Sequence, residues 1–352
     1  MGRPGVGQSL RARVLYFTAP YQVTVRQERL SPPAPGQVLV QTVISAISSG
    51  TELLIYRGQA PTDLPADETI TALSGALTFP LKYGYAAVGR VIAVGSPAER
   101  AWQGRLIFAF QPHASYFVST PDELLAVPDA LSPEEAVFLP NMETAVNFLM
   151  DGHPLIGERV VVFGQGVVGL LTTALLVRVP LSRLITLDRY PFRRERSREL
   201  GAHASLDASK DDVLARLQGC LQEEHTAAGA DLTYELSGSP GALDQAIAVT
   251  GFNGRVVIGS WYGQKRADLN LGGRFHRSRM RLISSQVSTI APEWSGRWTT
   301  GRRLHIAWQM LQHVRPAHLI THRFPVEQAS QAYALLDQHP EEAMQVLFTY
   351  GA

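Results

Sequence analysis

Apolar and polar positions alternate in short runs over the first third of the chain. Turns that contain Pro and Gly separate these runs, which lie at residues 13–17, 37–47, 89–95, 105–110 and 114–119. Short alternating runs of this kind predict the strands of a small β-barrel rather than βαβ units. The polar segment 60–70 interrupts the pattern, and we expect it to form a long surface loop.

From Ser132 the apolar spacing becomes helical and then alternates between strand and helix. A Ser-Pro start with two early acids predicts a helix over 132–150. The next predicted strands lie at 160–163, 184–188, 204–207, 231–236, 254–261 and 280–287, and the helices at 168–177, 191–201, 211–224 and 240–250. Such alternation predicts an α/β fold with a parallel, doubly wound sheet. Helices at 302–313 and 326–338 and a strand at 344–350 follow.

A glycine-rich turn joins the first strand of this alternating region to its helix. Gly164, Gly166 and Gly169 have the spacing G-x-G-x-x-G, and Asp188 ends the next predicted strand, nineteen residues after the last glycine. Together these features favour a dinucleotide site over a turn without a ligand. The helix N-terminus presents unpaired N–H groups to phosphates, and an acid at this distance accepts from a ribose diol. The predicted cofactor-binding residues of the turn are Gly164, Gln165, Gly166, Val167, Val168 and Gly169.

The residues around Asp188 bear on the choice between NAD and NADP. A carboxylate repels a 2′-phosphate, which favours NAD. Arg189, Arg193 and Arg194 follow at once and offer guanidinium groups to that phosphate, so NADP is the alternative. The other interpretation of these arginines is a solvated helix face.

Composition narrows the class of protein. The 352 residues are 45% hydrophobic and 18% charged, which suits two globular domains. The net charge of +1 gives no basis for binding nucleic acid or an anionic membrane. We find no signal-peptide pattern at the N-terminus and no apolar stretch long enough to span a membrane, so we expect a soluble, cytoplasmic protein. Cys220 is the single cysteine, which excludes a disulfide scaffold and a four-cysteine zinc lobe.

Four strings give the chain a family resemblance. They are SSGTE at 48–52, YGYAAVGRVIAVG at 83–95, VFGQGVVG at 162–169 and LITHRFPVEQASQAYALLD at 319–337. With these in order, the chain resembles the medium-chain dehydrogenase/reductase superfamily over nearly its whole length. The resemblance implies a GroES-like catalytic domain at 1–146, a Rossmann domain at 147–286 and a C-terminal part at 287–352 that returns to the catalytic domain. It also implies a small-molecule substrate and a homodimer or homotetramer.

The chain departs from this family at the zinc site. Ser49 stands where zinc-dependent members have a cysteine, and Tyr85 and Ala86 stand where they have His and Glu. Serine and alanine are poor zinc ligands at neutral pH, so we expect no metal. The rival interpretation is a rearranged site that uses Glu52, His113 or Glu143.

The resemblance also assigns the remaining candidates. Thr51 matches the family's hydroxyl beside the substrate oxygen, but Leu54 stands where a relay histidine would follow. The Tyr85 phenol can donate to a carbonyl oxygen or fill the vacated metal cavity, and a phenol suits an acid better than a base. Glu52 can orient Thr51 or Tyr85, or end a turn.

Other candidates are less specific. Glu143 can face the cleft or cap a helix, and His113 is more probable at a surface or turn than in catalysis. At the strand ends, Gly259, Ser260 and Trp261 match backbone contacts to the nicotinamide, with Ser285 and Gln286 as weaker candidates.

These features imply a zinc-independent, NAD(P)-dependent oxidoreductase that transfers a hydride between nicotinamide and a secondary alcohol or ketone. Three strings also resemble, more loosely, the bacteriochlorophyllide a dehydrogenase branch: GTELLIYRG at 50–58 and the stretches 153–171 and 274–286. This looser resemblance implies a hydroxyethyl-chlorin substrate. One alternative is an NAD(P)H-dependent enone or quinone reductase, since an oxyanion contact and a hydride suffice for it. The other is a non-catalytic cofactor-binding protein.

Overall fold

The structure is a computed structural model that describes residues 10–222 and 228–351. It divides into two compact units: Met1–Pro140 with Ala317–Ala352, and Asn141–Pro316. The sequence placed the boundaries after 146 and 286 instead. The second boundary lies later than predicted because α8 (Thr300–Val314) packs against α4 (Val167–Leu176) within the second unit. Residues 1–9, part of the stretch assessed for a signal peptide, lie outside the described residues.

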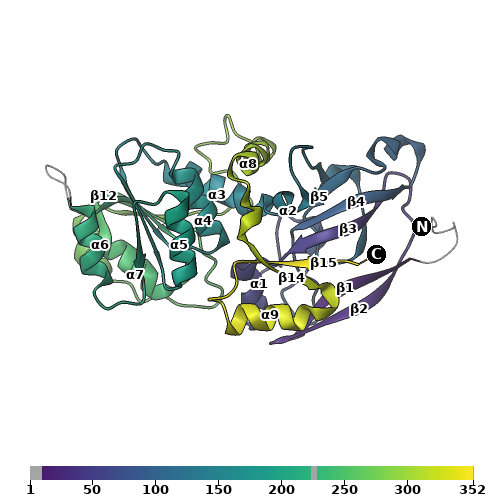
Figure 1. Cartoon of the computed structure of the whole chain (residues 1–352), viewed down its shortest axis with the longest axis horizontal. Helices are drawn as coiled ribbons and strands as arrows, with labels where there is room; N and C mark the ends of the chain where they lie inside the picture. Colours follow the sequence, from purple (N-terminus) through teal and green to yellow (C-terminus); the bar gives the residue numbers. More distant parts are fainter. Residues whose placement is uncertain (1–9, 223–227, 352) are drawn as a thin grey trace. The chain divides into compact units, whose positions relative to one another are not determined.

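The second unit holds a six-stranded parallel sheet (Figure 1). Its strands are β8 (Arg159–Phe163), β9 (Arg183–Asp188), β10 (Ala204–Asp207), β11 (Ala230–Glu235), β12 (Thr250–Ile258) and β13 (Arg281–Ser284). Their spatial order is β10-β9-β8-β11-β12-β13, which is the Rossmann order. The strand order reverses between β8 and β11, and ligands of such sheets bind outside the carboxyl ends of the strands at this point. The expected α/β class with a doubly wound sheet is confirmed.

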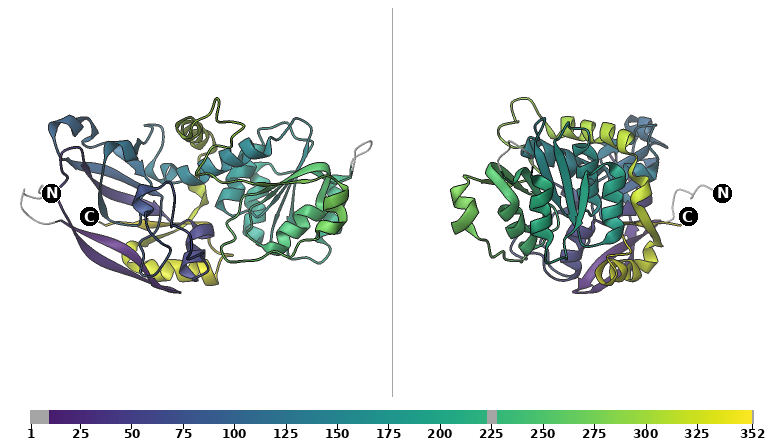
Figure 2. Two further views of the ribbon diagram at one scale, coloured as in Figure 1. Left: turned by 180° about the vertical axis from the view of Figure 1, so that it is seen from behind. Right: turned by 60° about the vertical axis from the view of Figure 1, so that its left-hand side comes forward.

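Helices cover both faces of this sheet, as Figures 1 and 2 show. Val161 and Phe163 of β8 point to a core with α6 (Val213–Leu221) and α7 (Pro240–Val249). Val160 and Val162 point the other way, to a core with α3 (Leu139–Gly152) and α4. Both faces are apolar because a parallel strand is buried on both sides. The remaining helix of the sheet, α5 (Pro191–Leu200), packs on α4 and β10.

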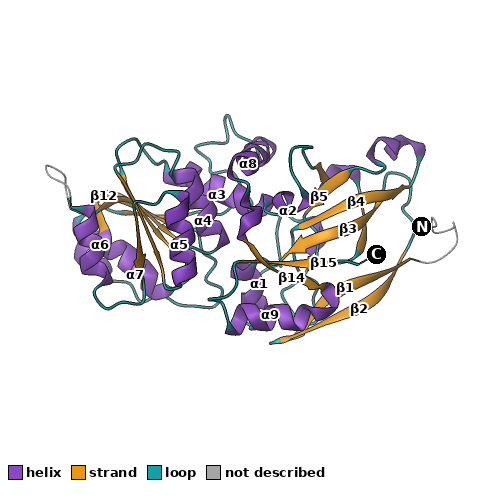
Figure 3. Ribbon diagram, in the orientation of Figure 1, coloured by secondary structure: helices purple, strands orange, loops and turns teal. Residues whose placement is uncertain are grey.

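The first unit is mostly β (Figure 3). A seven-stranded sheet has the order β14-β15-β3-β4-β5-β7, with β6 also paired to β3. Its strands are β3 (Val38–Ala46), β4 (Ala87–Val94), β5 (Leu106–Ala109), β6 (Tyr116–Ser119), β7 (Leu124–Ala126), β14 (Ile320–Pro325) and β15 (Gln345–Thr349). A separate hairpin of β1 (Leu10–Ala19) and β2 (Gln22–Leu30) is joined by single bridges to Leu81 and Ala114, which lie outside the strands of that sheet. The α-helices of this unit are α1 (Ser49–Tyr56), α2 (Pro133–Ala136) and α9 (Ala329–Gln338).

Sequence patterning missed four of these elements: α1, β2, β7 and β14. The pattern of β2 is hard to recognise because most of its residues are at least partly exposed and polar. The helix α1 begins within the SSGTE string, where small polar residues hide the helical spacing. Among the described residues, no helix combines the length and the apolar character needed to cross a membrane.

Candidate functional site

The glycine turn lies at the carboxyl end of β8, where Gly166 is the N-cap of α4. A β-carbon on Gly164 (φ +92°) would come within 2.7 Å of the Leu236 backbone, and one on Gly169 within 2.0 Å of the Gly164 carbonyl oxygen. A β-carbon on Gly166 would enter open space, since its nearest neighbour is Arg193 Nη1 at 4.0 Å. Gly164 and Gly169 therefore shape the turn, while Gly166 leaves room over the N-terminus of α4 for a phosphate group.

The Asp188 carboxylate holds this turn from the next strand. Its Oδ2 accepts the Gln165 N–H at 2.8 Å, and its Oδ1 accepts the Tyr190 N–H at 2.9 Å. The Gln165 side chain is fully buried and points into the fold, where Nε2 donates to the Gly164 carbonyl and Oε1 accepts from Thr173. Gln165 therefore offers its backbone, not its amide side chain, to a ligand. Asp188 keeps acceptor capacity, because a carboxylate has about four lone-pair positions.

The three arginines after Asp188 differ in their contacts. Arg194 pairs with Asp207 at 3.3 Å and donates to the carbonyls of residues 188 and 189, so it fastens the turn. The Arg193 guanidinium lies 3.9 Å from Asp188 Oδ2 and over the Tyr190 ring. Arg189 is exposed and lies over the same ring. Arg193 is thus the arginine that the structure brings beside both Asp188 and Gly166.

The carboxyl ends of β11 and β12 form a fixed corner next to the turn. A β-carbon on Gly259 would come within 2.3 Å of the Phe148 ring, so the glycine is required by packing against α3. Ser260 Oγ accepts the Gly238 N–H at 2.8 Å, and Trp261 is half-buried.

Sequence reasoning missed Glu235, which is fully buried at the end of β11. Its carboxylate accepts from the Ser237 N–H at 2.8 Å and from the Tyr262 hydroxyl at 2.6 Å. The signal that could have found it was an acid directly after the apolar positions of a predicted strand.

Glu143 and Ser285 belong to a buried polar network of the second unit. Glu143 Oε1 accepts from the fully buried Arg303 Nε at 3.0 Å, and Arg303 also donates to Asn147 at 2.6 Å. Burial raises the pKa of Glu143, and the attraction of Arg303 opposes that rise. Ser285 accepts from Asn147 and donates to Asp151, whose pKa burial also raises. Glu143 therefore has a structural role as the counter-ion of Arg303.

In the first unit, three hydroxyl groups meet at the start of α1. The Tyr85 hydroxyl donates to Ser48 Oγ and lies 3.3 Å from Thr51 Oγ1. All three side chains are half-buried, and we call them the hydroxyl cluster. Burial raises the pKa of Tyr85, while its hydrogen bonds to Ser48 and Thr51 oppose the rise. The sequence singled out Ser49, but the structure brings its neighbour Ser48 to Tyr85.

The Glu52 carboxylate lies behind the hydroxyl cluster and is fully buried. It accepts the Ser48 N–H at 2.7 Å, His113 Nε2 at 3.0 Å and the Tyr333 hydroxyl. Within the described part of the chain, Glu52 makes no direct hydrogen bond to Thr51 or Tyr85, so the predicted orienting role can only be indirect. It acts on the cluster through the backbone of Ser48 and ties α1 to α9.

His113 is also fully buried, so the expectation of a surface position is wrong, although the residue does lie in a bend between β5 and β6. Its Nδ1 is 2.6 Å from Ser45 Oγ, which in turn contacts the Tyr350 hydroxyl at 2.7 Å. Gly84 (φ +116°) makes room for it, because a β-carbon there would come within 2.8 Å of the imidazole. The histidine is a buried structural group, and Gly84 allows the segment before Tyr85 to cross directly over it.

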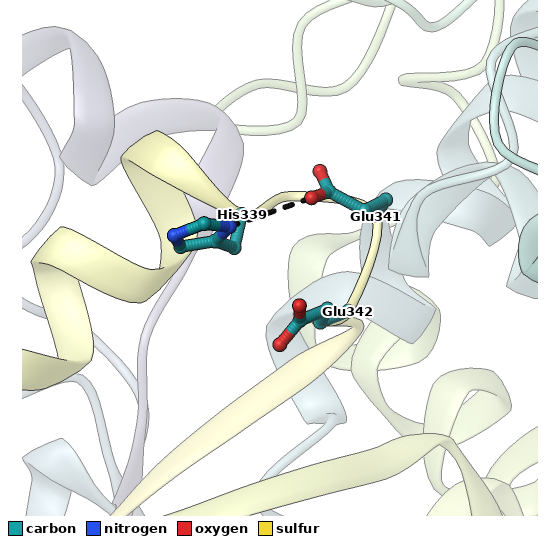
Figure 4. A group of neighbouring side chains, drawn as sticks. All are labelled: His339, Glu341 and Glu342. Atoms are coloured by element: carbon teal, nitrogen blue, oxygen red, sulfur yellow. Dashed lines mark ion pairs between the residues drawn. The ribbon is translucent and has the colours of Figure 1, made fainter.

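The side chains around Tyr85 do not form a set of ligands that suits a zinc ion. Ser49, Tyr85 and Ala86 provide no thiolate or imidazole, and the Glu52 and His113 side chains are bonded to each other. Glu143 is committed to Arg303. Over residues 10–222 and 228–351, one group of three metal-type side chains comes together: His339, Glu341 and Glu342, all exposed between α9 and β15 (Figure 4). There His339 and Glu341 form an ordinary surface pair at 3.5 Å.

Comparison with known proteins gives one consistent picture. Residues 167–300 match the family described as Zinc-binding dehydrogenase. The chain is 28% identical over 250 residues to the zinc-type alcohol dehydrogenase-like protein YphC of Escherichia coli K12, covering 69% of this chain and 65% of that protein. It is 28% identical over 278 residues to the (R,R)-butanediol dehydrogenase of Bacillus subtilis, covering 71% of this chain and 78% of that enzyme.

The fold comparison agrees. A structure of an alcohol dehydrogenase (rspB) from E. coli CFT073, complexed with NADH, superimposes with a TM-score of 0.77 at 18% identity, covering 97% of this chain and 99% of that one. The glycine turn, the Rossmann strand order and these relatives make this chain similar to the zinc-type alcohol dehydrogenases of the medium-chain dehydrogenase/reductase superfamily.

Proposed function

We propose that this protein is a zinc-independent, NAD(P)-dependent oxidoreductase that interconverts a secondary alcohol and a ketone. The observation that supports the proposal is the hydroxyl cluster, in which the Tyr85 hydroxyl contacts Ser48 and Thr51. The sequence resemblance matches Tyr85 to a zinc ligand of the family, so a proton donor would take the place of the metal. The relative from Bacillus subtilis is a butanediol dehydrogenase, and this supports an alcohol as the substrate class.

The open space over Gly166 supports cofactor binding. The backbone N–H groups at the N-terminus of α4 would hold the pyrophosphate, and Asp188 would accept from the adenosine ribose. The bound nicotinamide would supply or take up the hydride. The E. coli CFT073 relative binds NADH, which agrees with this assignment.

We propose NAD as the preferred cofactor, because the Asp188 carboxylate would repel a 2′-phosphate. Arg193 lies 3.9 Å from that carboxylate and partly offsets its charge, so NADPH binding would be weakened rather than abolished. The measurement is the ratio of the NADPH and NADH dissociation constants. A ratio below one would contradict the preference.

The cluster fits the reduction of a carbonyl compound best. A phenol with a raised pKa remains protonated at neutral pH and donates to the carbonyl oxygen as the hydride reaches the carbonyl carbon. The Tyr85 proton would move to that oxygen, and solvent would restore it through the Ser48 and Thr51 hydroxyls. In the opposite direction the same groups would carry the alcohol proton away.

The Tyr85 hydroxyl also favours a second candidate function, an enone or quinone reductase, because that reaction likewise depends mainly on a hydrogen bond to the developing oxyanion. Within the alcohol class, the looser sequence resemblance favours a hydroxyethyl group on a chlorin ring. A homodimer or homotetramer stays a prediction that the mass in solution measures.

A substrate panel tests these alternatives with the full chain and both cofactors. Secondary alcohols, their ketones, enones, quinones and a hydroxyethyl chlorin would be compared after treatment with a strong chelator. We expect turnover of the alcohol–ketone pairs to survive the chelator. Turnover of enones or quinones alone would favour the reductase. A loss of activity that added zinc restores would contradict zinc independence. If no hydride transfer is detected with any substrate, the protein would be a non-catalytic cofactor-binding protein.

A further inference from the structure

An apolar groove lies in the second unit, away from the glycine turn. Its volume is about 590 Å³, within the range usual for small-molecule sites. It is bounded by the ends of α3 and α4, by one face of α8 and by the segment 294–298. Leu175 of α4 and Arg178, which follows that helix, lie at its end opposite Gly166, about 15 Å away for ten residues. The groove is therefore separate from the proposed cofactor site.

The walls of the groove are apolar and aromatic. Ile306 and Met310 line it at helical spacing from α8, and Trp294 and Trp298 line it from the neighbouring segment. The Trp294 indole donates to the Met150 carbonyl at 3.2 Å, which fixes that ring. At the rim, Leu155 is 60% exposed, and its neighbour Ile156 is 81% exposed. Exposed apolar residues next to an apolar groove mark a surface that binds an apolar body.

Three arginines give this groove its charge. Arg178, Arg297 and Arg302 all line it, and none of them has a carboxylate partner among the residues that the structure describes. Arg297 lies over the Trp294 ring and Arg302 over the Trp298 ring. Arg178 and Arg302 each donate once to a backbone carbonyl, so most of their N–H groups remain available.

Among the described residues, no acid lines the groove. Glu293 contacts His153 Nε2 at 3.1 Å, and the His153 ring lies against Trp294. The apolar groove thus has three cations at its rim and no carboxylate in its lining. Guanidinium groups held against aromatic rings bind carboxylates well, because the rings orient them and exclude water.

We propose that this groove binds an anionic amphiphile, a molecule that joins an apolar body to a carboxylate. The apolar body would lie on α8 and the tryptophans, and the carboxylate would accept from Arg297 and Arg302. A concave site between helices suits one molecule taken from solution better than the flat surface of a bilayer. The proposal does not depend on the reaction that the enzyme catalyses.

Decanoate is the probe, with decanol and decyltrimethylammonium as neutral and cationic controls of equal chain length. Calorimetry and tryptophan fluorescence on the full chain would measure binding below micellar concentrations. We expect decanoate to bind about tenfold more tightly than either control. Arg297→Gln with Arg302→Gln should remove that preference while decanol binding stays unchanged. Arg216→Gln, an exposed arginine of α6 without a side-chain partner among the described residues, is the matched control.

Other outcomes would overturn the proposal. Equal affinity for all three probes would show a plain apolar surface. Binding to vesicles of anionic lipid without binding of free decanoate would assign the groove to a membrane. A change of oligomeric mass in the double arginine variant, with no decanoate binding to the parent chain, would assign it to a second copy of the chain. Circular dichroism and NADH binding of each variant would show that the fold and the cofactor site are intact.

Discussion

The hydroxyl of Tyr85 donates a hydrogen bond to the hydroxyl of Ser48, and the backbone N–H of Ser48 donates to the buried carboxylate of Glu52. The position of the phenol is thus fixed in two steps by a group that never touches it. This arrangement links the phenol of Tyr85 to a buried carboxylate through Ser48.

Replacing Tyr85 with Phe tests this donor directly. The variant loses the proton donor but keeps the ring, which packs edge-on to Tyr83. We expect kcat/KM for ketone reduction to fall by about 10²–10⁴. NADH affinity should stay unchanged, because the glycine turn lies in the other unit. Ser49→Ala is the control, since the structure shows no hydrogen bond from Ser49 to Tyr85, and unchanged kcat/KM in Tyr85→Phe would contradict the donor role.

The pH dependence of ketone reduction follows from the same residue. Burial raises the pKa of Tyr85 above its ordinary value of 10.0, so the protonated, active form is present below that raised pKa and is lost above it. The rate of the reductive half-reaction should therefore be flat from neutral pH to about pH 10 and decline only at higher pH. A single-turnover measurement over this range gives the profile. In Tyr85→Phe this alkaline decline should disappear; a decline centred near pH 7 in the parent chain would assign the proton to another group.

Two glycines of the turn should respond differently to the same substitution. In Gly166→Ala the new methyl group enters the open space over α4, so the free energy of unfolding should change by less than about 1 kcal/mol. NADH should nevertheless bind about tenfold more weakly or worse, because the methyl group occupies the place of the phosphates. In Gly169→Ala the methyl group meets the Gly164 carbonyl oxygen at 2.0 Å, which should cost about 1–3 kcal/mol of stability.

Urea unfolding and NADH titration separate these two effects. Equal losses of stability in both variants would mean that Gly166 also serves the packing of the turn. Unchanged NADH affinity in Gly166→Ala would mean that the cofactor does not bind there, and the dinucleotide interpretation of the motif would fail.

The turn could be predicted from the sequence because its parts are local. Gly164, Gly166 and Gly169 lie within six residues, and their spacing encodes strand, turn and helix together. Asp188 was found because it ends the next strand, and that strand pairs directly with β8. Periodicity likewise predicted the parallel sheet, since buried strands and amphipathic helices leave strong patterns.

The buried residues that hold the hydroxyl cluster in place could not be predicted from local sequence patterns. Glu52 contacts His113, 61 residues away, and Tyr333, 281 residues away, so no local pattern records these contacts. Arg303 lies in the predicted helix 302–313, and no local pattern shows that it is fully buried against Glu143, 160 residues earlier. Buried polar side chains are misjudged from sequence because their burial depends on partners that only the fold supplies.

Glu52→Ala tests whether the buried carboxylate supports the cluster. The variant leaves the Ser48 N–H, the His113 imidazole and the Tyr333 hydroxyl without their acceptor in a fully buried site. Unpaired buried groups of this kind should lower the free energy of unfolding by about 3–5 kcal/mol. Glu68→Ala, an exposed acid without a side-chain partner among the described residues, should change it by less than about 0.5 kcal/mol. Urea unfolding measures the stability of both variants. Glu52→Gln keeps an acceptor oxygen and should lose less free energy of unfolding than Glu52→Ala. Equal stability of all three variants would mean that the carboxylate does not hold α1 in place.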